Sequence, residues 1–164
     1  MSAQMEMGMD AAADMGEEVQ CVMIPLAHSN ILLPNVCVAE ILPWRRIKAL
    51  QSVPDWMSGI LGWRGETVPV VNFELLNEHP DSRVANGRCL VVMNRAGLSR
   101  GPAFYGIVAE GLPRLLQVAA EDLVARDENG GPYTSAHVQL GTEAAVIPDL
   151  ERLERQIKML GLEG

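Results

Sequence analysis

Short apolar runs separated by turn residues dominate the sequence from Val19 onward. Strands are predicted where these runs are rich in β-branched residues: 19–26, 31–33, 60–63, 67–71, 90–93, 104–109, 136–140 and 143–147. A short helical turn running into a strand is expected at 36–42, with further single helical turns at 53–59 and 73–76. Another apolar run, 112–118, is interrupted by Pro113 and Arg114. Many short strands and little helix indicate an all-β barrel or sandwich.

The chain ends in a different pattern. After Pro148, apolar residues recur at helical spacing: Leu150, Leu153, Ile157 and Leu160. An amphipathic helix is therefore predicted at about 149–160, with Asp149 as its N-cap and Gly161 as its stop. We expect the apolar face of this helix to pack against the protein's own barrel, and contact with a partner is the alternative.

Residues 1–18 lack a periodic apolar face. They contain five methionines and five acidic residues among small side chains. A disordered acidic, Met-rich tail is the preferred interpretation, and a thioether metal cluster is the alternative. The ordered domain is expected to span 19–164.

Charge restricts the classes of partner. The chain has 13 basic and 21 acidic residues, a formal net charge of −8, and no basic stripe. A phosphate backbone would be repelled, so a nucleic acid is not expected as a partner. The uncharged stretch 19–39 contains polar residues and two prolines, which fit two strands and a turn better than a membrane span. No direct membrane insertion and no export signal are expected, which indicates a cytoplasmic protein.

Residues that could carry catalysis or bind metal are scattered. The relevant side chains are Cys21, Cys37, Cys89, His28, His79 and His137. None has the spacing of a zinc site, and the cysteines lie in apolar runs typical of buried free thiols. The sequence contains no Gly-x-Ser-x-Gly elbow and no phosphate-binding Walker loop. No catalytic residue, metal or cofactor is therefore predicted.

The segment from Trp56 to Asn72 is the most specific motif. Arg64–Gly65 lies between two apolar runs and predicts a tight hairpin turn, in which glycine supplies positive φ. From the residues alone, Arg64 is either an exposed or internally paired turn residue, or a cation that recognises a partner. Glu40, isolated in an apolar run, is either a solvent-facing strand residue or a partner contact.

This segment resembles the signature of the CheW family of chemotaxis coupling proteins, Gly-apolar-apolar-Asn-x-Arg-Gly-x-x-x-Pro-Val. The residues that carry the likeness are Gly59, Ile60, Leu61, Arg64, Gly65, Pro69 and Val70. Weaker similarities follow in sequence order at 38–41, 90–93, 105–108 and 115–123. Gly62 stands where the family usually has Asn or Asp, and Ala109 where Asp is common. These departures suggest a divergent member, for which a ChpC-type protein of a pilus chemosensory system is one candidate.

The resemblance implies a mainly β fold of two intertwined, five-stranded SH3-like barrels with a C-terminal helix. It further implies a non-enzymatic adaptor between the cytoplasmic tip of a methyl-accepting chemoreceptor and the regulatory domain of a CheA-type histidine kinase, recruited to receptor arrays. Positions matching Val38, Glu40 and Arg64 lie on the family's receptor-binding side, and Gly65 sets the turn. Trp63 is either a core residue or an interface residue. The alternative function is a small β-barrel that binds another protein or a small ligand outside chemotaxis.

Overall fold

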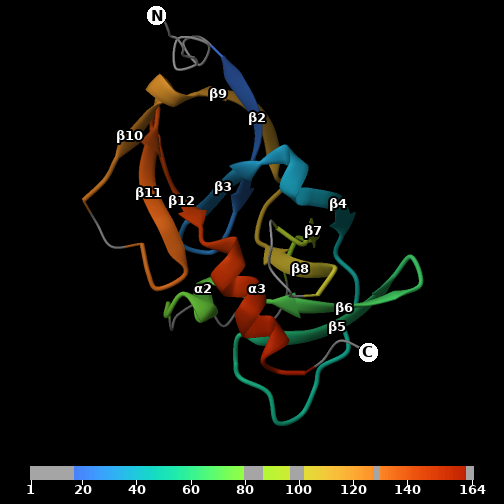
Figure 1. Cartoon of the computed structure of the whole chain (residues 1–164). Coiled ribbons are helices and arrows are strands. Elements are labelled where there is room, and N and C mark those ends of the chain that lie inside the picture. Colours follow the sequence, from blue (N-terminus) through green and yellow to red (C-terminus); the bar gives the residue numbers. More distant parts are fainter. Residues whose placement is uncertain (1–16, 80–86, 97–101, 128–129, 162–164) are drawn as a thin grey trace, which may run out of the picture.

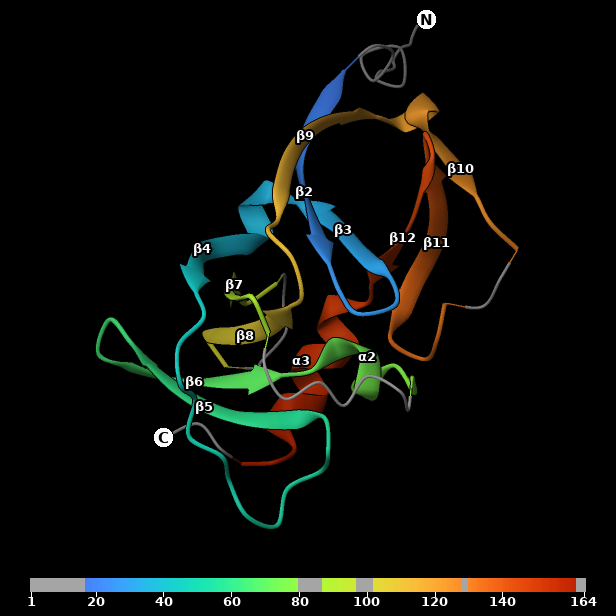
Figure 2. The ribbon, with the colours of Figure 1, turned by 180° about the vertical axis from the view of Figure 1, so that it is seen from behind.

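The computed structural model describes residues 17–79, 87–96, 102–127 and 130–161. The predicted tail at 1–18 lies almost entirely outside these residues. Within them the chain forms two curled sheets with one longer helix between them, as Figures 1 and 2 show from opposite sides.

The first sheet has six strands. In spatial order they are β10 (Leu123–Ala125), β11 (Thr134–Leu140), β12 (Glu143–Pro148), β3 (Asn30–Pro34), β2 (Glu18–Pro25) and β9 (Arg114–Ala119). Only β3 and β12 pair in parallel. A 3-10 turn, η2 (Ala120–Asp122), joins β9 to β10 and lets the sheet curl (Figure 1).

The second sheet has five strands. In spatial order they are β4 (Val38–Pro43), β7 (Cys89–Asn94), β8 (Phe104–Ala109), β6 (Glu66–Val71) and β5 (Met57–Trp63). This sheet is formed by one continuous stretch of chain, which enters it through η1 (Asn35–Cys37) and includes the short helix α2 (Phe73–Leu76). The chain then returns to the first sheet, so the two sheets are intertwined. The predicted mainly β fold is confirmed, with six strands instead of five in the first sheet.

Successive apolar side chains along the strands point to opposite faces of the sheets and form three apolar cores. In β2, Cys21 and Met23 face the interior of the six-stranded sheet, whereas Val22 and Ile24 face a central core between the sheets. Strand β7 alternates in the same way between the central core and the interior of the five-stranded sheet. Because successive side chains of a strand point to opposite faces, one strand can serve two cores. This explains why the strands read as continuous apolar runs.

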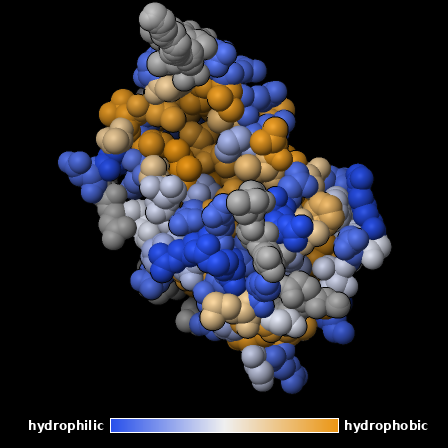
Figure 3. Space-filling view, in the orientation of Figure 1, coloured by the Kyte–Doolittle hydropathy of each residue, from blue (hydrophilic) through white to orange (hydrophobic). Residues whose placement is uncertain are grey.

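The C-terminal helix α3 (Leu150–Lys158) fills the space between the sheets. Its N-terminus is capped by Asp149, whose side chain accepts from the backbone N–H of Arg152 at 3.1 Å. Leu153 and Ile157 are completely buried in the central core. The predicted core-facing role of its apolar face is therefore correct, and Figure 3 shows a hydrophilic outer surface over this helix.

Two buried carboxylates attach the helices to the rest of the protein. Glu154 of α3 accepts from the backbone N–H of Ala96 at 3.1 and 3.0 Å and from the Tyr105 hydroxyl at 2.7 Å. Burial and the Glu154 carboxylate raise the pKa of Tyr105 well above its ordinary value, so the hydroxyl stays protonated and donates. Glu74 of α2 accepts from the β2–β3 turn, through the Ser29 hydroxyl at 2.9 Å and two backbone N–H groups.

The predicted helical turn at 53–59 is wrong. Only a turn at Asp55–Trp56 forms, and β5 already begins at Met57. Gly59, the last residue of that predicted turn, is instead a strand residue with φ of 152°, at an irregularity in the pairing of β5 with β6. There it faces Lys48, which forms an isolated bridge with Ile60. A glycine within a strand often marks such a close approach of backbone.

Candidate functional site

The hairpin formed by β5 and β6 carries the most exposed part of the motif. The pair Trp63–Glu66 closes it, and Arg64 and Gly65 occupy the turn with φ of 49° and 78°. Two successive positive φ values define the turn type whose twist matches that of the flanking strands. No atom lies within 4 Å of the place that a Cβ on Gly65 would take, so backbone conformation rather than space favours glycine there.

Curling of the five-stranded sheet brings its two edge strands together. Strands β4 and β5 lie at opposite ends of the strand order. Glu40 of β4 nevertheless accepts hydrogen bonds from the indole N–H of Trp63, at 2.9 Å, and from Nη2 of Arg64, at 3.1 Å. The Glu40 carboxylate thus joins the edges of the sheet by side-chain contacts. We call Glu40, Trp63 and Arg64 the seam cluster.

Trp63 belongs to the core, which decides between the two roles left open by the sequence. Its exposed fraction is 8%, and it packs edge to face on Phe104 with ring centroids 4.9 Å apart. Its indole also lies under the guanidinium of Arg64, whose Cζ is 5.1 Å from the ring centroid. A fixed core residue therefore orients both charged members of the seam cluster.

In the seam cluster, hydrogen bonds fix the Glu40 carboxylate, while the Arg64 guanidinium stays accessible to solvent. The hydrogen bond from Trp63, followed by the charge of Arg64, lowers the pKa of Glu40 below its ordinary value. A lowered carboxylate pKa means that the contact is present at neutral pH and is lost as pH falls through that pKa. The side chain of Glu40 is 36% exposed and that of Arg64 is 70% exposed. Most of the guanidinium is therefore open to a partner.

Val38 lies on the same strand as Glu40 but in different surroundings. A register irregularity separates the two residues in the pairing of β4 with β7. Val38 is half-buried and packs against the central core. Exposed apolar side chains flank it, at Val36 in η1 and at Ile41 in β4. Of the three residues expected from the resemblance, the structure brings Glu40 and Arg64 into contact, whereas Val38 packs against the central core on the same strand as Glu40.

No pattern in the sequence predicts the contact between Glu40 and the Trp63–Arg64 pair. Glu40 and the Trp63–Arg64 pair are separated by more than twenty residues. Neither the apolar run around Glu40 nor the hairpin motif around Arg64 indicates that the two meet. A tryptophan followed by Arg-Gly is the only local hint, because an indole N–H that is buried usually requires an acceptor.

Metal and thiol chemistry find little support. In the described part of the chain, no group of three or more His, Cys, Asp or Glu side chains could hold a metal ion. Cys21, Cys37 and Cys89 are free thiols, and burial raises the pKa of each. A raised thiol pKa lowers the reactive thiolate fraction. Among the described residues, no helix has the length and apolar character that a membrane span requires.

Comparison with known proteins identifies the architecture. The model of the CheW-like domain family matches residues 20–158. The solved structure of the scaffolding protein TtCheW from Thermoanaerobacter tengcongensis superposes with a TM-score of 0.67, covering 92% of this chain and 91% of that one. The two sequences are 12% identical, so this likeness concerns the fold alone. None of the curated proteins matches the sequence.

Proposed function

Because the chain belongs to the CheW-like family of chemotaxis scaffold proteins, we propose that it couples chemoreceptors to a CheA-type histidine kinase without catalysing a reaction. The protein binds the cytoplasmic tip of a methyl-accepting receptor with one surface and the regulatory domain of the kinase with another. Receptor state reaches the kinase as a coupling free energy between these two sites.

The seam cluster is the observation that supports this proposal most strongly. It presents Arg64 at 70% side-chain exposure, held in place by Glu40 and by the Trp63 ring. A guanidinium fixed in this way loses less conformational entropy when it forms directed hydrogen bonds with a partner. The exposed apolar residues Val36 and Ile41 add area that a partner would bury. A charged group beside apolar area is typical of protein interfaces.

Arg64→Ala tests the receptor-binding role. We expect about tenfold weaker binding to the receptor tip, because truncating an interface arginine costs on the order of 1–2 kcal/mol. Kinase binding should change less, since the proposal assigns the kinase to another surface. The melting temperature should stay nearly constant, because an exposed ion pair contributes little to stability. Calorimetric titration against each partner separately, with a thermal melt, provides the readout.

Arg114→Ala is the matched control. Arg114 also pairs with a carboxylate, Glu143, at 2.7 Å, and both side chains are about half exposed, at 51% and 42%. This pair lies on the six-stranded sheet, away from β4 and β5. The control should bind the receptor tip like the wild type. Wild-type receptor affinity of Arg64→Ala would show that the site is wrongly assigned, and unfolding would show that Arg64 is structural.

The cellular setting follows from the same proposal. The protein is expected in the cytoplasm, recruited to membrane-bound receptor arrays by its partners. Its pathway drives either flagella or type IV pili, and a ChpC-type role corresponds to the second. Parallel titrations against the receptor and kinase of each pathway in the source organism distinguish them, since only the cognate pair should bind in the micromolar range typical of signalling contacts.

A further inference from the structure

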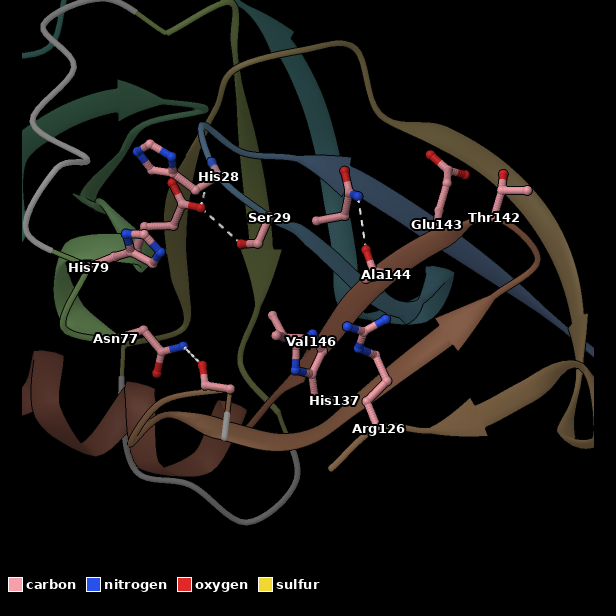
Figure 4. A pocket seen from close by; sticks show the side chains of 13 residues that line it. His28, Ser29, Asn77, His79, Arg126, His137, Thr142, Glu143, Ala144 and Val146 are labelled. Atoms are coloured by element: carbon pink, nitrogen blue, oxygen red, sulfur yellow. Dashed lines mark hydrogen bonds between the residues drawn. The ribbon is translucent and has the colours of Figure 1, made fainter. Parts of the chain in front are cut away.

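A polar cavity of about 530 Å³ lies away from the seam cluster. The elements that form it are the β2–β3 turn, α2 with the residues after it, the segment following β10, and the β11–β12 hairpin. All three histidines of the chain line it, together with Arg126, Glu74 and Glu143. Figure 4 shows His28 and His79 at one end of the cavity and Arg126 with His137 nearer the other. Residues far apart in sequence thus converge here.

The two carboxylates of this cavity already have partners. Glu74 accepts from the Ser29 hydroxyl at 2.9 Å and from the backbone N–H groups of residues 27 and 28. Glu143 accepts two 2.7 Å hydrogen bonds from Arg114. Glu74 is therefore engaged by three hydrogen-bond donors and Glu143 by a cation, which leaves both carboxylates poorly suited to bind a metal ion. The absence of a three-ligand metal cluster among the described residues agrees with this.

His137 carries the unusual feature of the cavity wall. Its Nδ1 is buried and has no hydrogen-bond partner among the described residues. A buried polar atom without a partner costs free energy and is rare in folded proteins, so it requires an explanation such as a missing ligand. Strand β11 places His137 directly beside Arg126, whose backbone N–H donates to the His137 carbonyl at 2.8 Å. Nη1 of Arg126 also donates to the side-chain oxygen of Gln139. A permanent positive charge, partly engaged by Gln139, thus accompanies the unpartnered ring nitrogen.

The opposite end of the cavity adds two more imidazoles. His28 and His79 stack in parallel, with ring centroids 4.7 Å apart and planes within 6°. The stack joins the β2–β3 turn to the segment after α2, so it fixes the position of two ring edges at the cavity. Imidazole nitrogens donate hydrogen bonds to anionic oxygens, as guanidinium groups do.

From this arrangement we infer that the cavity binds a small anion through a carboxylate or phosphate group, held by the Arg126 guanidinium and, once a small rotation of the ring exposes it, by Nδ1–H of His137. The cavity volume lies within the range of small-molecule sites. Binding here does not depend on the proposed adaptor role, because the elements of the cavity do not include the seam strands β4 and β5. The ligand would contact both the six-stranded sheet and the α2 segment of the other half.

Titration calorimetry on the full chain tests the inference with two probes, inorganic phosphate and succinate. We expect at least one probe to bind with a dissociation constant on the order of 1 mM or tighter. Arg126→Gln and His137→Phe should each weaken binding about tenfold or more, since each removes one charged or directional donor. The probe that binds more tightly distinguishes a phosphate ligand from a carboxylate ligand. Arg45→Gln, at an exposed arginine outside the cavity, should leave affinity unchanged.

A thermal melt of His137→Phe separates loss of contact from loss of fold. Phenylalanine keeps the ring but removes the unpartnered nitrogen, so the melting temperature should stay equal or rise. A lower melting temperature would overturn the inference, because the ring nitrogen would then be structural. Failure of both probes to bind the wild type at millimolar concentration, unchanged affinity in both variants, or zinc binding that requires His137 would overturn it as well.

Discussion

Glu154→Ala should destabilise the protein by about 3–5 kcal/mol, the range for removing one partner of a buried charged network. Glu154 is completely buried, and its carboxylate is the acceptor for the Ala96 backbone N–H and for the Tyr105 hydroxyl. Truncation would leave the buried Tyr105 hydroxyl and the part-buried Ala96 N–H without this acceptor, and a cavity beside Ile157 and Leu153. Helix α3 would then lose its polar attachment to the segment after β7.

Urea denaturation followed by circular dichroism measures this effect. Glu151→Ala is the control, because Glu151 is exposed on the same helix and should cost below about 1 kcal/mol. Glu154→Gln keeps an acceptor oxygen for Tyr105 and should fall between the two. If Glu154→Ala unfolds at the same urea concentration as Glu151→Ala, the attachment of α3 does not depend on this carboxylate.

Gly59→Ala should also be severe. We expect it to lower the free energy of unfolding by about 3 kcal/mol, because steric overlap and backbone strain act together. A Cβ on Gly59 would lie 2.4 Å from the Lys48 carbonyl oxygen, far inside contact distance. That oxygen accepts from the Ile60 backbone N–H at 2.9 Å, and Lys48 N–H donates to the Ile60 carbonyl at 2.9 Å. Because the obstacle is backbone, it cannot move aside without breaking this bridge.

Gly62→Ala on the same strand is the matched control for Gly59→Ala. No atom lies within 4 Å of a Cβ placed on Gly62, and the residue is exposed. The free energy of unfolding of this control should lie within about 0.5 kcal/mol of the wild-type value, as is usual for surface substitutions. Equal denaturation midpoints for the two alanine variants would contradict the close approach of β5 and residue 48.

Local patterns were sufficient to predict the elements that depend on local physics. The turn at Arg64–Gly65 follows from glycine between two β-rich runs, and α3 follows from apolar spacing with Asp149 as a cap. The mistaken helical turn before Gly59 shows the limit of such patterns. A glycine that ends a helix and a glycine that permits close backbone approach look alike until the partner, here Lys48, is known.

The contacts that the sequence could not predict join residues that are far apart along the chain. Glu40 meets Arg64 only because the five-stranded sheet curls until its edges touch. Glu74 of α2 and Glu154 of α3 are charged residues, yet both are buried with donors from elements far along the chain. Buried carboxylates are uncommon, and their partners are set by tertiary packing rather than by spacing. The convergence of three separated histidines on one cavity has the same origin.

Formation of a ternary complex tests the adaptor proposal most directly. The cytoplasmic tip of the cognate chemoreceptor and the regulatory domain of the kinase are mixed with and without this protein, and complex mass is measured by sedimentation. We expect receptor and kinase fragments to sediment together only when the protein is present, and Arg64→Ala to lower the share of receptor fragment in the complex while the kinase fragment stays bound. Binding of one fragment that excludes the other, or binding of neither, would contradict a protein that bridges the two.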